Sequence, residues 1–384
     1  MLSVLVAKER VDGETRVSAT VETVKQMIKA GLSVVVESTA GEGAFISDTQ
    51  YKDAGATIAT EPKAAWGAAD IVLKVRAPQK HPGLDEIEAP KDGATVIGFL
   101  APYANDAMIR RYAEKRISSL PMELVPRITR AQKMDALSSQ ANIAGYKAVL
   151  MAAANLPKYF PLFMTAAGTV KPARVVIMGA GVAGLQAIAT AKRLGAVVEA
   201  SDVRPETKEQ IQSLGGKFIE LPKSEETGAG AGGYAREVSA DFLRQQQEIV
   251  GRHVAQADVV ITTALVPGRP APKLLPASMV EKMKAGSVIV DLAVEQGGNC
   301  ELSERGKEVR KHGVLIIGHP NLPATLPADA SMLYSRNVLA LLLNVITKEG
   351  ALNYDLTDEV TSGTLLTHDG KIVHAPTAQR LGAA

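Results

Sequence analysis

Three glycines at a fixed spacing give the first indication of chemistry. Residues 174–184 read RVVIMGAGVAG, so a strand-like run leads directly into a Gly-x-Gly-x-x-Gly pattern, and a helical pattern follows. The first glycine permits a tight turn, the second lets backbone amides approach a diphosphate, and the third lets helix and strand pack closely. The start of the helix supplies oriented N–H groups for negative charge. The segment predicts a dinucleotide-binding turn, with contacts from Gly179, Ala180, Gly181, Val182 and Gly184.

An acidic residue after the next strand-like run indicates which dinucleotide binds. Asp202 lies 23 residues beyond the first glycine, directly after the apolar segment 196–201. A carboxylate at this spacing binds the adenine-ribose hydroxyls and repels a 2′-phosphate, which favours NAD(H) over NADP(H). Arg204, two residues on and next to Val203, is a mild counter-signal, because arginine can accept a 2′-phosphate. The alternative is that Asp202 only caps a helix at 205–213.

Two further segments are read against this turn. Gly228, Gly230 and Gly233 repeat the glycine pattern, but they follow charged residues rather than a strand, so we interpret the match as coincidental. They lie in 222–236, whose glycine-rich composition predicts a mobile surface loop. The segment 258–268 reads DVVITTALVPG, and a loop at the end of such a strand lines the ligand crevice of a doubly wound sheet. We expect its Ala264 and Leu265 to pack near the nicotinamide ribose, with an ordinary strand-to-helix turn as the alternative.

Strand-like and helical patterns alternate along the chain, which is typical of βαβ units. Strands are expected at 2–7, 32–37, 70–75, 94–99, 116–120, 174–178, 196–201, 217–220, 258–262, 287–291 and 314–317. Helices are expected at 18–30, 104–115, 138–154 and 328–347, the third capped by Ser138 or Ser139. The fold class is α/β, with two Rossmann-like doubly wound parallel-sheet domains joined by long helices across a cleft. Residues 1–136 plus 328–384 would form the first domain, and 137–327 the NAD(H)-binding domain.

Composition limits the other classes of function. The 384 residues are 46% hydrophobic and 22% charged, with a net charge of +2 and no basic stripe, which argues against nucleic acid. No stretch approaches the roughly 20 apolar residues of a membrane span, so direct membrane insertion is not expected. The single cysteine, Cys300, precludes an internal disulfide, and the six histidines lack metal-ligand spacing, so no metal site is predicted.

With these residues in view, the chain resembles the family of alanine dehydrogenase and the NAD(H)-binding subunit of proton-translocating transhydrogenase. The likeness spans nearly the whole chain and is carried by segments 14–17 (ETRV), 73–78 (LKVRAP), 170–184, 265–268 (LVPG) and 291–298 (DLAVEQGG). Each segment is weakly specific alone, and together they are specific.

Departures from the alanine dehydrogenase pattern separate the two branches. Arg16 and Lys74 match an arginine and a lysine that surround the amino-acid substrate in alanine dehydrogenases. The place of their histidine holds Phe99, and the place of their catalytic aspartate holds Glu295. Without the imidazole, amine oxidation has no obvious proton acceptor. An alanine dehydrogenase-like enzyme and a non-catalytic NAD(H)-binding protein stay open as alternatives.

The segment 127–138 (RITRAQKMDALS) matches the transhydrogenase branch. The resemblance implies that it lines the nicotinamide and faces NADP(H) carried by a partner subunit, with Arg127, Gln132, Asp135 and Ser138 at the transfer site. Cofactor contacts are expected from Arg127, Ile128, Thr129, Arg130, Gln132, Asp135, Ser138 and, in a loop that closes over the nucleotide, Gly233 and Tyr234. The alternative is a polar loop that caps the following helix. The resemblance also implies a homodimer, membrane-spanning partner subunits, and a cytoplasmic location, peripheral on the inner face of the cell membrane.

Overall fold

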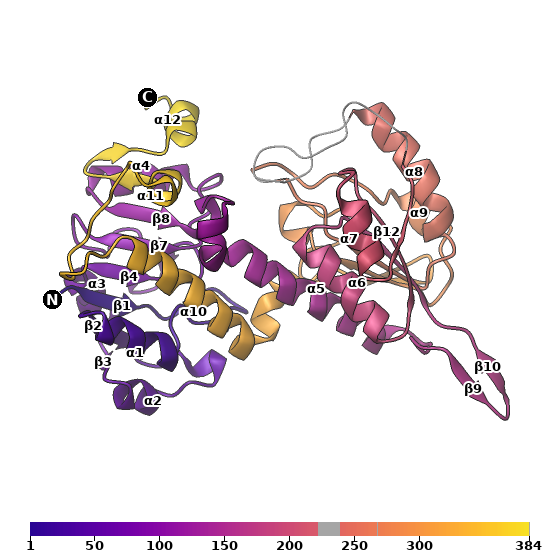
Figure 1. Ribbon diagram of the computed structural model, residues 1–384, viewed down its shortest axis with the longest axis horizontal. Helices are drawn as coiled ribbons and strands as arrows, with labels where there is room; N and C mark the ends of the chain where they lie inside the picture. The colour runs from indigo at the N-terminus through magenta and orange to yellow at the C-terminus, as the bar shows by residue number, and fades with distance from the viewer. Residues whose placement is uncertain (222–238, 267, 384) are drawn as a thin grey trace. The chain divides into compact units, whose positions relative to one another are not determined.

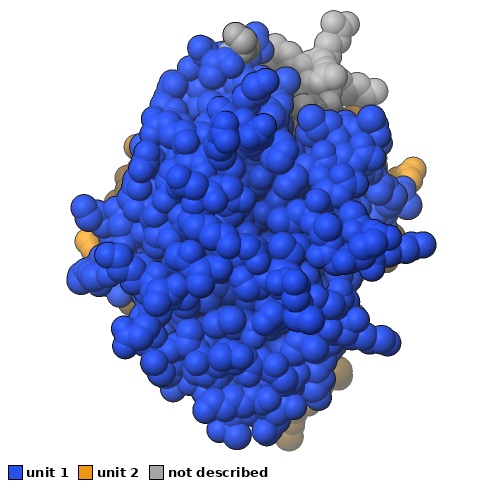
Figure 2. All heavy atoms as spheres, turned by 90° about the vertical axis from the view of Figure 1, so that its left-hand side faces the viewer, with its two compact units in different colours: residues 1–140, 324–384 blue, residues 141–323 orange. Residues whose placement is uncertain are grey.

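The computed structural model describes residues 1–221, 239–266 and 268–383. The chain forms two compact units, of which unit 1 comprises residues 1–140 and 324–384, and unit 2 comprises residues 141–323. Figure 1 traces the chain from end to end, and Figure 2 shows the two separate segments of unit 1 packed into one continuous body.

Unit 1 contains an eight-stranded sheet of order β19-β18-β8-β7-β4-β1-β2-β3. Its strands are β1 (Ser3–Val6), β2 (Ser33–Glu37), β3 (Thr57–Ala59), β4 (Ile71–Leu73), β7 (Thr95–Gly98), β8 (Ser118–Pro121), β18 (Thr367–His368) and β19 (Lys371–Ile372). The strands from β8 to β3 pair in parallel, and the C-terminal hairpin β18–β19 adds antiparallel to β8. β5 (Lys80–His81) and β6 (Leu84–Asp85) form a separate small hairpin.

Helices cover both faces of this sheet because alternate strand residues are apolar on both sides. Val4, Val6 and Leu73 face one core with helix α10, and Leu5 and Val72 face the other. The helices are α1 (Val21–Lys29), α2 (Asp48–Asp53), α3 (Pro62–Ala68), α4 (Asp106–Glu114), α10 (Pro327–Asn344), α11 (Glu359–Thr364) and α12 (Ala375–Leu381). Short 3₁₀ turns are η1 (Glu42–Ala44), η2 (Met122–Leu124) and η3 (Thr129–Met134).

Unit 2 contains a seven-stranded sheet of order β13-β12-β11-β14-β15-β17-β16. Its strands are β11 (Arg174–Met178), β12 (Val197–Ser201), β13 (Lys217–Phe218), β14 (Val259–Thr262), β15 (Val288–Asp291), β16 (Glu308–Lys311) and β17 (Val314–Ile317). All pairs are parallel except β16–β17. The order of the strands along the chain reverses between β11 and β14, where a doubly wound sheet forms its ligand crevice.

Helices pack on both faces of this second sheet as well. They are α6 (Val182–Arg193), α7 (Thr207–Ser213), α8 (Ala240–Val254), α9 (Ala277–Val280) and most of α5 (Ala136–Asn155), which begins in unit 1; η5 (Val294–Gln296) and η6 (Leu322–Thr325) are 3₁₀ turns. In α5, Gly145 lies directly on α6, since a Cβ there would meet the carbonyl oxygen of Ala183 at 2.0 Å. A hairpin of β9 (Phe163–Thr165) and β10 (Gly168–Val170) projects from unit 2 (Figure 1).

The α/β fold class expected from the sequence is confirmed, and each expected strand is found, in several cases shortened by a few residues. The sequence reading missed β3, β16 and the hairpin β9–β10. These elements lie at sheet edges or outside the sheets, where half or more of the side chains meet solvent and the apolar pattern is weak.

Candidate functional site

The glycine turn after β11 is held by contacts that leave no room for side chains. Gly179 has a φ of +102°, which favours glycine, and a Cβ there would lie 2.6 Å from Oγ1 of Thr263. A Cβ on Gly184 would lie 1.9 Å from the carbonyl oxygen of Gly179. Helix α6 can therefore approach β11 this closely only with glycine at position 184.

Gly181 differs from the other two glycines of the turn. Its φ of −73° is open to any residue, and a Cβ there would meet nothing nearer than the Arg204 guanidinium at 3.9 Å. It is also the N-cap residue of α6, so it provides no side chain to accept the first N–H groups of the helix. Open space beside unfilled helix-end donors fits a diphosphate, which needs both room and N–H groups.

Asp202 stands at the end of β12 and is tied to the glycine turn. Its buried carboxylate accepts a hydrogen bond from the Ala180 N–H at 2.7 Å. Nη2 of Arg204 donates to the same oxygen at 2.7 Å, and Nε and the backbone N–H of Arg204 each donate to the other oxygen at 2.9 Å. These bonds to the carboxylate raise the pKa of the Arg204 guanidinium above its ordinary value. The helix-cap alternative for Asp202 is wrong, because α7 begins at Thr207 with Glu206 as its N-cap.

The segment after β14 lies at the same edge of the sheet. The Thr263 hydroxyl donates to the Gly179 carbonyl oxygen at 3.0 Å, which joins the β14 loop to the glycine turn. Ala264 and Leu265 follow and are half-buried. Unit 2 thus brings the glycine turn, Asp202 and Ala264 together at the carboxyl ends of three adjacent strands, where a dinucleotide binds in this fold.

The segment 127–138 belongs to unit 1 and contains η3. Ala131 and Met134 are buried in the unit 1 core, and Ile128 packs against that core. The remaining polar members of the expected site are exposed: Arg127, Thr129, Arg130 and Gln132. The turn therefore anchors itself through its apolar side chains and presents its polar ones.

Asp135 and Ser138 form the start of helix α5. Each oxygen of the Asp135 carboxylate accepts one hydrogen bond from Ser138, at 2.9 Å from its backbone N–H and at 2.6 Å from its hydroxyl. Since α5 begins at Ala136, the capping side chain is Asp135, and the expectation of Ser138 or Ser139 in that role is wrong. The helix-capping alternative thus describes what Asp135 does for the fold, and leaves a further role of this pair a prediction.

Two residues that the sequence reading missed fix this segment from α10 and α11. Asn337 donates to the Lys133 carbonyl oxygen at 2.9 Å and accepts from the Ser139 hydroxyl at 2.7 Å, so it spans η3 and α5. Arg130 forms an ion pair with Asp358. Both partners are about 200 residues away in sequence, and no local pattern marks them.

The expected site residues thus fall into two groups, the glycine turn with Asp202 and Ala264 in unit 2, and residues 127–138 in unit 1. Gly233 and Tyr234 lie outside the described residues.

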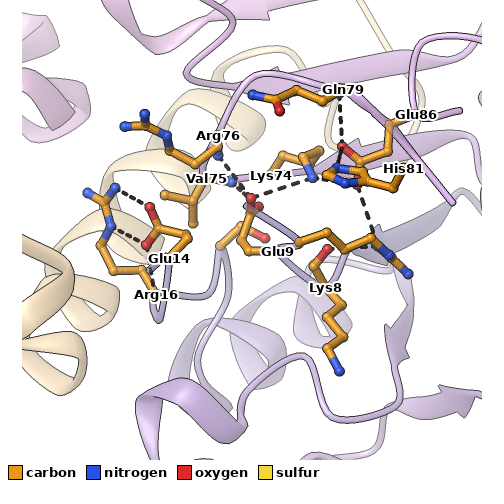
Figure 3. A network of polar contacts seen from close by, with 12 residues as sticks. Lys8, Glu9, Glu14, Arg16, Lys74, Val75, Arg76, Gln79, His81 and Glu86 are labelled. Atoms are coloured by element: carbon orange, nitrogen blue, oxygen red, sulfur yellow. Dashed lines mark hydrogen bonds and ion pairs between the residues drawn. The ribbon is translucent and has the colours of Figure 1, made fainter. Parts of the chain in front are cut away.

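The two cations that match alanine dehydrogenases are both engaged by carboxylates in unit 1 (Figure 3). Arg16 is buried, pairs with Glu14 through two nitrogens at 2.7 and 2.8 Å, and donates to Gln140 at 2.9 Å. Lys74 is buried and lies 2.9 Å from Glu86 and 3.5 Å from Glu9. Burial raises the pKa of Glu9, against the opposing effect of Lys74. A substrate carboxylate would have to compete with these internal partners.

Phe99 and Glu295 occupy the places of the alanine dehydrogenase histidine and aspartate. The Phe99 ring packs on Tyr334 with centroids 5.2 Å apart, and the Tyr334 hydroxyl donates to the Lys74 carbonyl oxygen at 2.7 Å. Glu295 is exposed in η5, 3.9 Å from Arg305. An aromatic ring at position 99 has no proton to exchange.

Metal and membrane signatures were sought over the described ranges. There, no three His, Cys, Asp or Glu side chains gather in a way that would hold a metal ion. In the same stretches of the chain, no helix combines the length and apolar character needed to cross a membrane.

The fold and the site together define a two-unit α/β protein with a dinucleotide-type glycine turn in its second unit. The family descriptions "Alanine dehydrogenase/PNT, N-terminal domain" and "Alanine dehydrogenase/PNT, C-terminal domain" match residues 5–144 and 148–375. The chain belongs to this alanine dehydrogenase/PNT family.

Individual relatives are closer on the transhydrogenase side of the family. The chain is 50% identical over 376 residues to the first of the polypeptides named NAD(P) transhydrogenase subunit alpha in Rhodospirillum rubrum, covering 97% of this chain and 98% of that protein. A transhydrogenase structure from Sinorhizobium meliloti matches with a TM-score of 0.86 and 47% identity, over 97% of this chain and 100% of the other. A structure of L-alanine dehydrogenase matches with a TM-score of 0.78 and 28% identity, over 98% of each chain. The alanine dehydrogenase alternative is therefore less supported.

Proposed function

We propose that the chain is the NAD(H)-binding subunit of a proton-translocating transhydrogenase. In this proposal NADH is held at the glycine turn of unit 2, and its hydride passes directly to NADP⁺ carried by a partner subunit. The proposal draws on the similarity to transhydrogenase alpha subunits along nearly the whole chain.

The observation that carries the proposal is the bond from the Ala180 N–H to the Asp202 carboxylate. It places a buried carboxylate beside the turn that would receive the diphosphate, where the adenine ribose hydroxyls need an acceptor. A 2′-phosphate there would meet the negative charge of Asp202, so the site favours NAD(H). Arg204 already shares that carboxylate, which leaves its charge less able to attract a 2′-phosphate.

The nicotinamide ring supplies the hydride chemistry when it is bound, so the residues of the chain orient the ring and exclude water. Direct transfer needs the two reacting carbons about 3–3.5 Å apart, and positioning alone can supply much of the rate. We assign Gln132 to the nicotinamide ribose and the partner's nucleotide. Arg127, Asp135 and Ser138 would hold the carboxamide and ribose, and Tyr234 would close over the nucleotide.

We further propose that the subunit works on the cytoplasmic side of the membrane, attached to membrane-spanning and NADP(H)-binding partner subunits. Two copies would form a homodimer. Support for self-association comes from the region of the β9–β10 hairpin, where Tyr159, Leu162, Phe163 and Met164 are exposed. Helix α10 is a poorer candidate, because most of its apolar side chains are buried in the core of unit 1.

The test is a hydride-transfer assay with and without the NADP(H)-binding partner. We expect negligible transfer by the chain alone and turnover once the partner is added. Full transhydrogenation by the isolated chain would contradict the division of labour. Consumption of NADH with pyruvate and ammonia would establish the amino-acid dehydrogenase instead, and NADH binding without turnover in either mixture would establish a non-catalytic NAD(H)-binding protein.

A further inference from the structure

Asn299, which the function described so far does not use, holds the peptide of Ala264 from both ends. Its Oδ1 accepts from the Ala264 N–H at 3.0 Å, and its Nδ2 donates to the Ala264 carbonyl oxygen at 2.9 Å. Nδ2 also donates to the Pro272 carbonyl oxygen at 2.9 Å. The side chain is fully buried, and both of its amide hydrogens are used.

The loop that carries Asn299 is built around a buried carboxylate. Asp291, the last residue of β15, accepts from the backbone N–H of Asn299 at 3.2 Å and from that of Cys300 at 3.0 Å. It also accepts from the Thr262 hydroxyl at 3.0 Å, which joins the loop to β14. Gly298 has a φ of +79°, and a Cβ there would lie 2.7 Å from Asp291 Oδ2. The chain therefore turns tightly at Gly298 and directs Asn299 toward the end of β14.

The peptide that Asn299 holds lies on one particular side of the ligand crevice. The strand order reverses between β11 and β14, and a dinucleotide lies across that point with one half on each side. Asp202, at the end of β12, is on the side expected for the adenine ribose. Ala264, at the end of β14, is on the other side, which is the side of the nicotinamide half.

We infer that Asn299 is a positioning residue that fixes the Ala264 peptide so that Ala264 and Leu265 seat the nicotinamide half of NAD(H). The inference rests on the proposed function. Asn299 acts through the Ala264 backbone, and the glycine turn and Asp202 read the adenosine half without it. Loss of the amide therefore weakens binding of the whole dinucleotide and spares fragments that lack nicotinamide.

The experiment compares Asn299→Asp and Asn299→Ser with Asn155→Asp as the matched control. Asn155 is exposed, and its side chain bonds only within α5, to the Met151 carbonyl oxygen. In Asn299→Asp, a carboxylate oxygen replaces Nδ2 and faces two carbonyl oxygens, whereas Asn299→Ser removes the amide without adding charge. Thermal melts first identify which variants fold. Binding of NADH and of ADP-ribose, which lacks nicotinamide, is then measured by calorimetry.

We expect the folded Asn299 variants to bind NADH at least about tenfold more weakly, while ADP-ribose affinity stays within about twofold of that of the unmodified chain. Asn155→Asp should match the unmodified chain for both ligands. Equal weakening of both ligands, or no weakening of either, would overturn the inference while NADH binding by the unmodified chain keeps the proposed function standing. Absence of NADH binding by the unmodified chain would overturn the proposed function, and this inference with it.

Discussion

The backbone N–H of Ala180 donates to the carboxylate of Asp202 at 2.7 Å, which joins the glycine turn after β11 to the end of β12. The two features that the sequence offers as separate signals are thus one hydrogen-bonded unit. Any change at Asp202 is expected to affect the shape of the turn as well as the recognition of ribose.

Asp202→Asn tests the choice between the two dinucleotides. The amide removes the negative charge that opposes a 2′-phosphate, and it leaves Arg204 without its ion pair at 2.7 Å. We expect weaker NADH binding and stronger NADPH binding, so the preference should narrow by about tenfold or more. Titration of both nucleotides by fluorescence measures this ratio, and an unchanged ratio would refute the assignment of Asp202.

Gly181→Ala and Gly184→Ala should separate binding from folding. A Cβ at position 181 meets nothing within 3.9 Å, so the variant should be as stable as the parent within about 0.5 kcal/mol, yet bind NADH poorly because the methyl group takes the space of the diphosphate. A Cβ at position 184 meets the Gly179 carbonyl oxygen at 1.9 Å, which should cost about 2–4 kcal/mol of stability.

The control for this pair is Gly251→Ala in helix α8, where the nearest atom to the new Cβ is the terminal methyl of Met279 at 3.4 Å. It should be neutral or slightly stabilising, since alanine favours helix. Unfolding in urea and NADH titration provide the two readouts. Normal NADH binding by Gly181→Ala would argue against a diphosphate at this turn.

Asp135 is expected to have two roles that can be separated. Asp135→Ala removes the acceptor of the Ser138 N–H and should cost about 1 kcal/mol of stability. Asp135→Asn retains a capping oxygen and should keep the stability, but it should slow hydride transfer to the partner if the carboxylate holds the nicotinamide end. The comparison needs urea unfolding and the partner assay. Unimpaired transfer by Asp135→Asn would reduce Asp135 to a helix cap.

Glu123 should make the stability of unit 1 depend on pH. Its carboxylate accepts from the backbone N–H groups of Leu100 and Ala101 at 3.1 and 2.8 Å, yet desolvation dominates and raises its pKa to about 7. The folded state therefore binds this proton more tightly than the unfolded state does. The stabilising contribution is complete below about pH 4 and is lost as the pH rises through about 7.

A difference of one pKa unit corresponds to about 1.4 kcal/mol, so the loss should not exceed about 3 kcal/mol. Glu123→Gln carries no titrating proton, and its unfolding free energy should fall less than that of the parent between about pH 5 and about pH 8. Urea unfolding across this range measures both proteins. Parallel pH profiles would show that Glu123 keeps an ordinary pKa.

The regions of the molecule that the sequence predicted are those with local signals. The glycine turn and the strand before it occupy 11 consecutive residues, and each glycine has a steric reason that the structure bears out at Gly179 and Gly184. The central strands were equally clear, because strands buried on both faces are continuously apolar.

The contacts that hold the candidate site together could not be predicted in the same way. Asn299 meets Ala264 across 35 residues, and Asn337 meets Lys133 across 204, so only the folded chain brings these partners together. The start of α5 was misplaced because serines at 138 and 139 are common capping residues, whereas the closer acceptor was Asp135.

The most direct test of NAD(H) binding at the glycine turn is a crystal structure of the chain with NADH bound. We expect the diphosphate on the N–H groups at the start of α6, beside Gly181, and a ribose hydroxyl within hydrogen-bond distance of the Asp202 carboxylate. Density for the cofactor elsewhere, with the turn at 179–184 empty, would contradict this binding site.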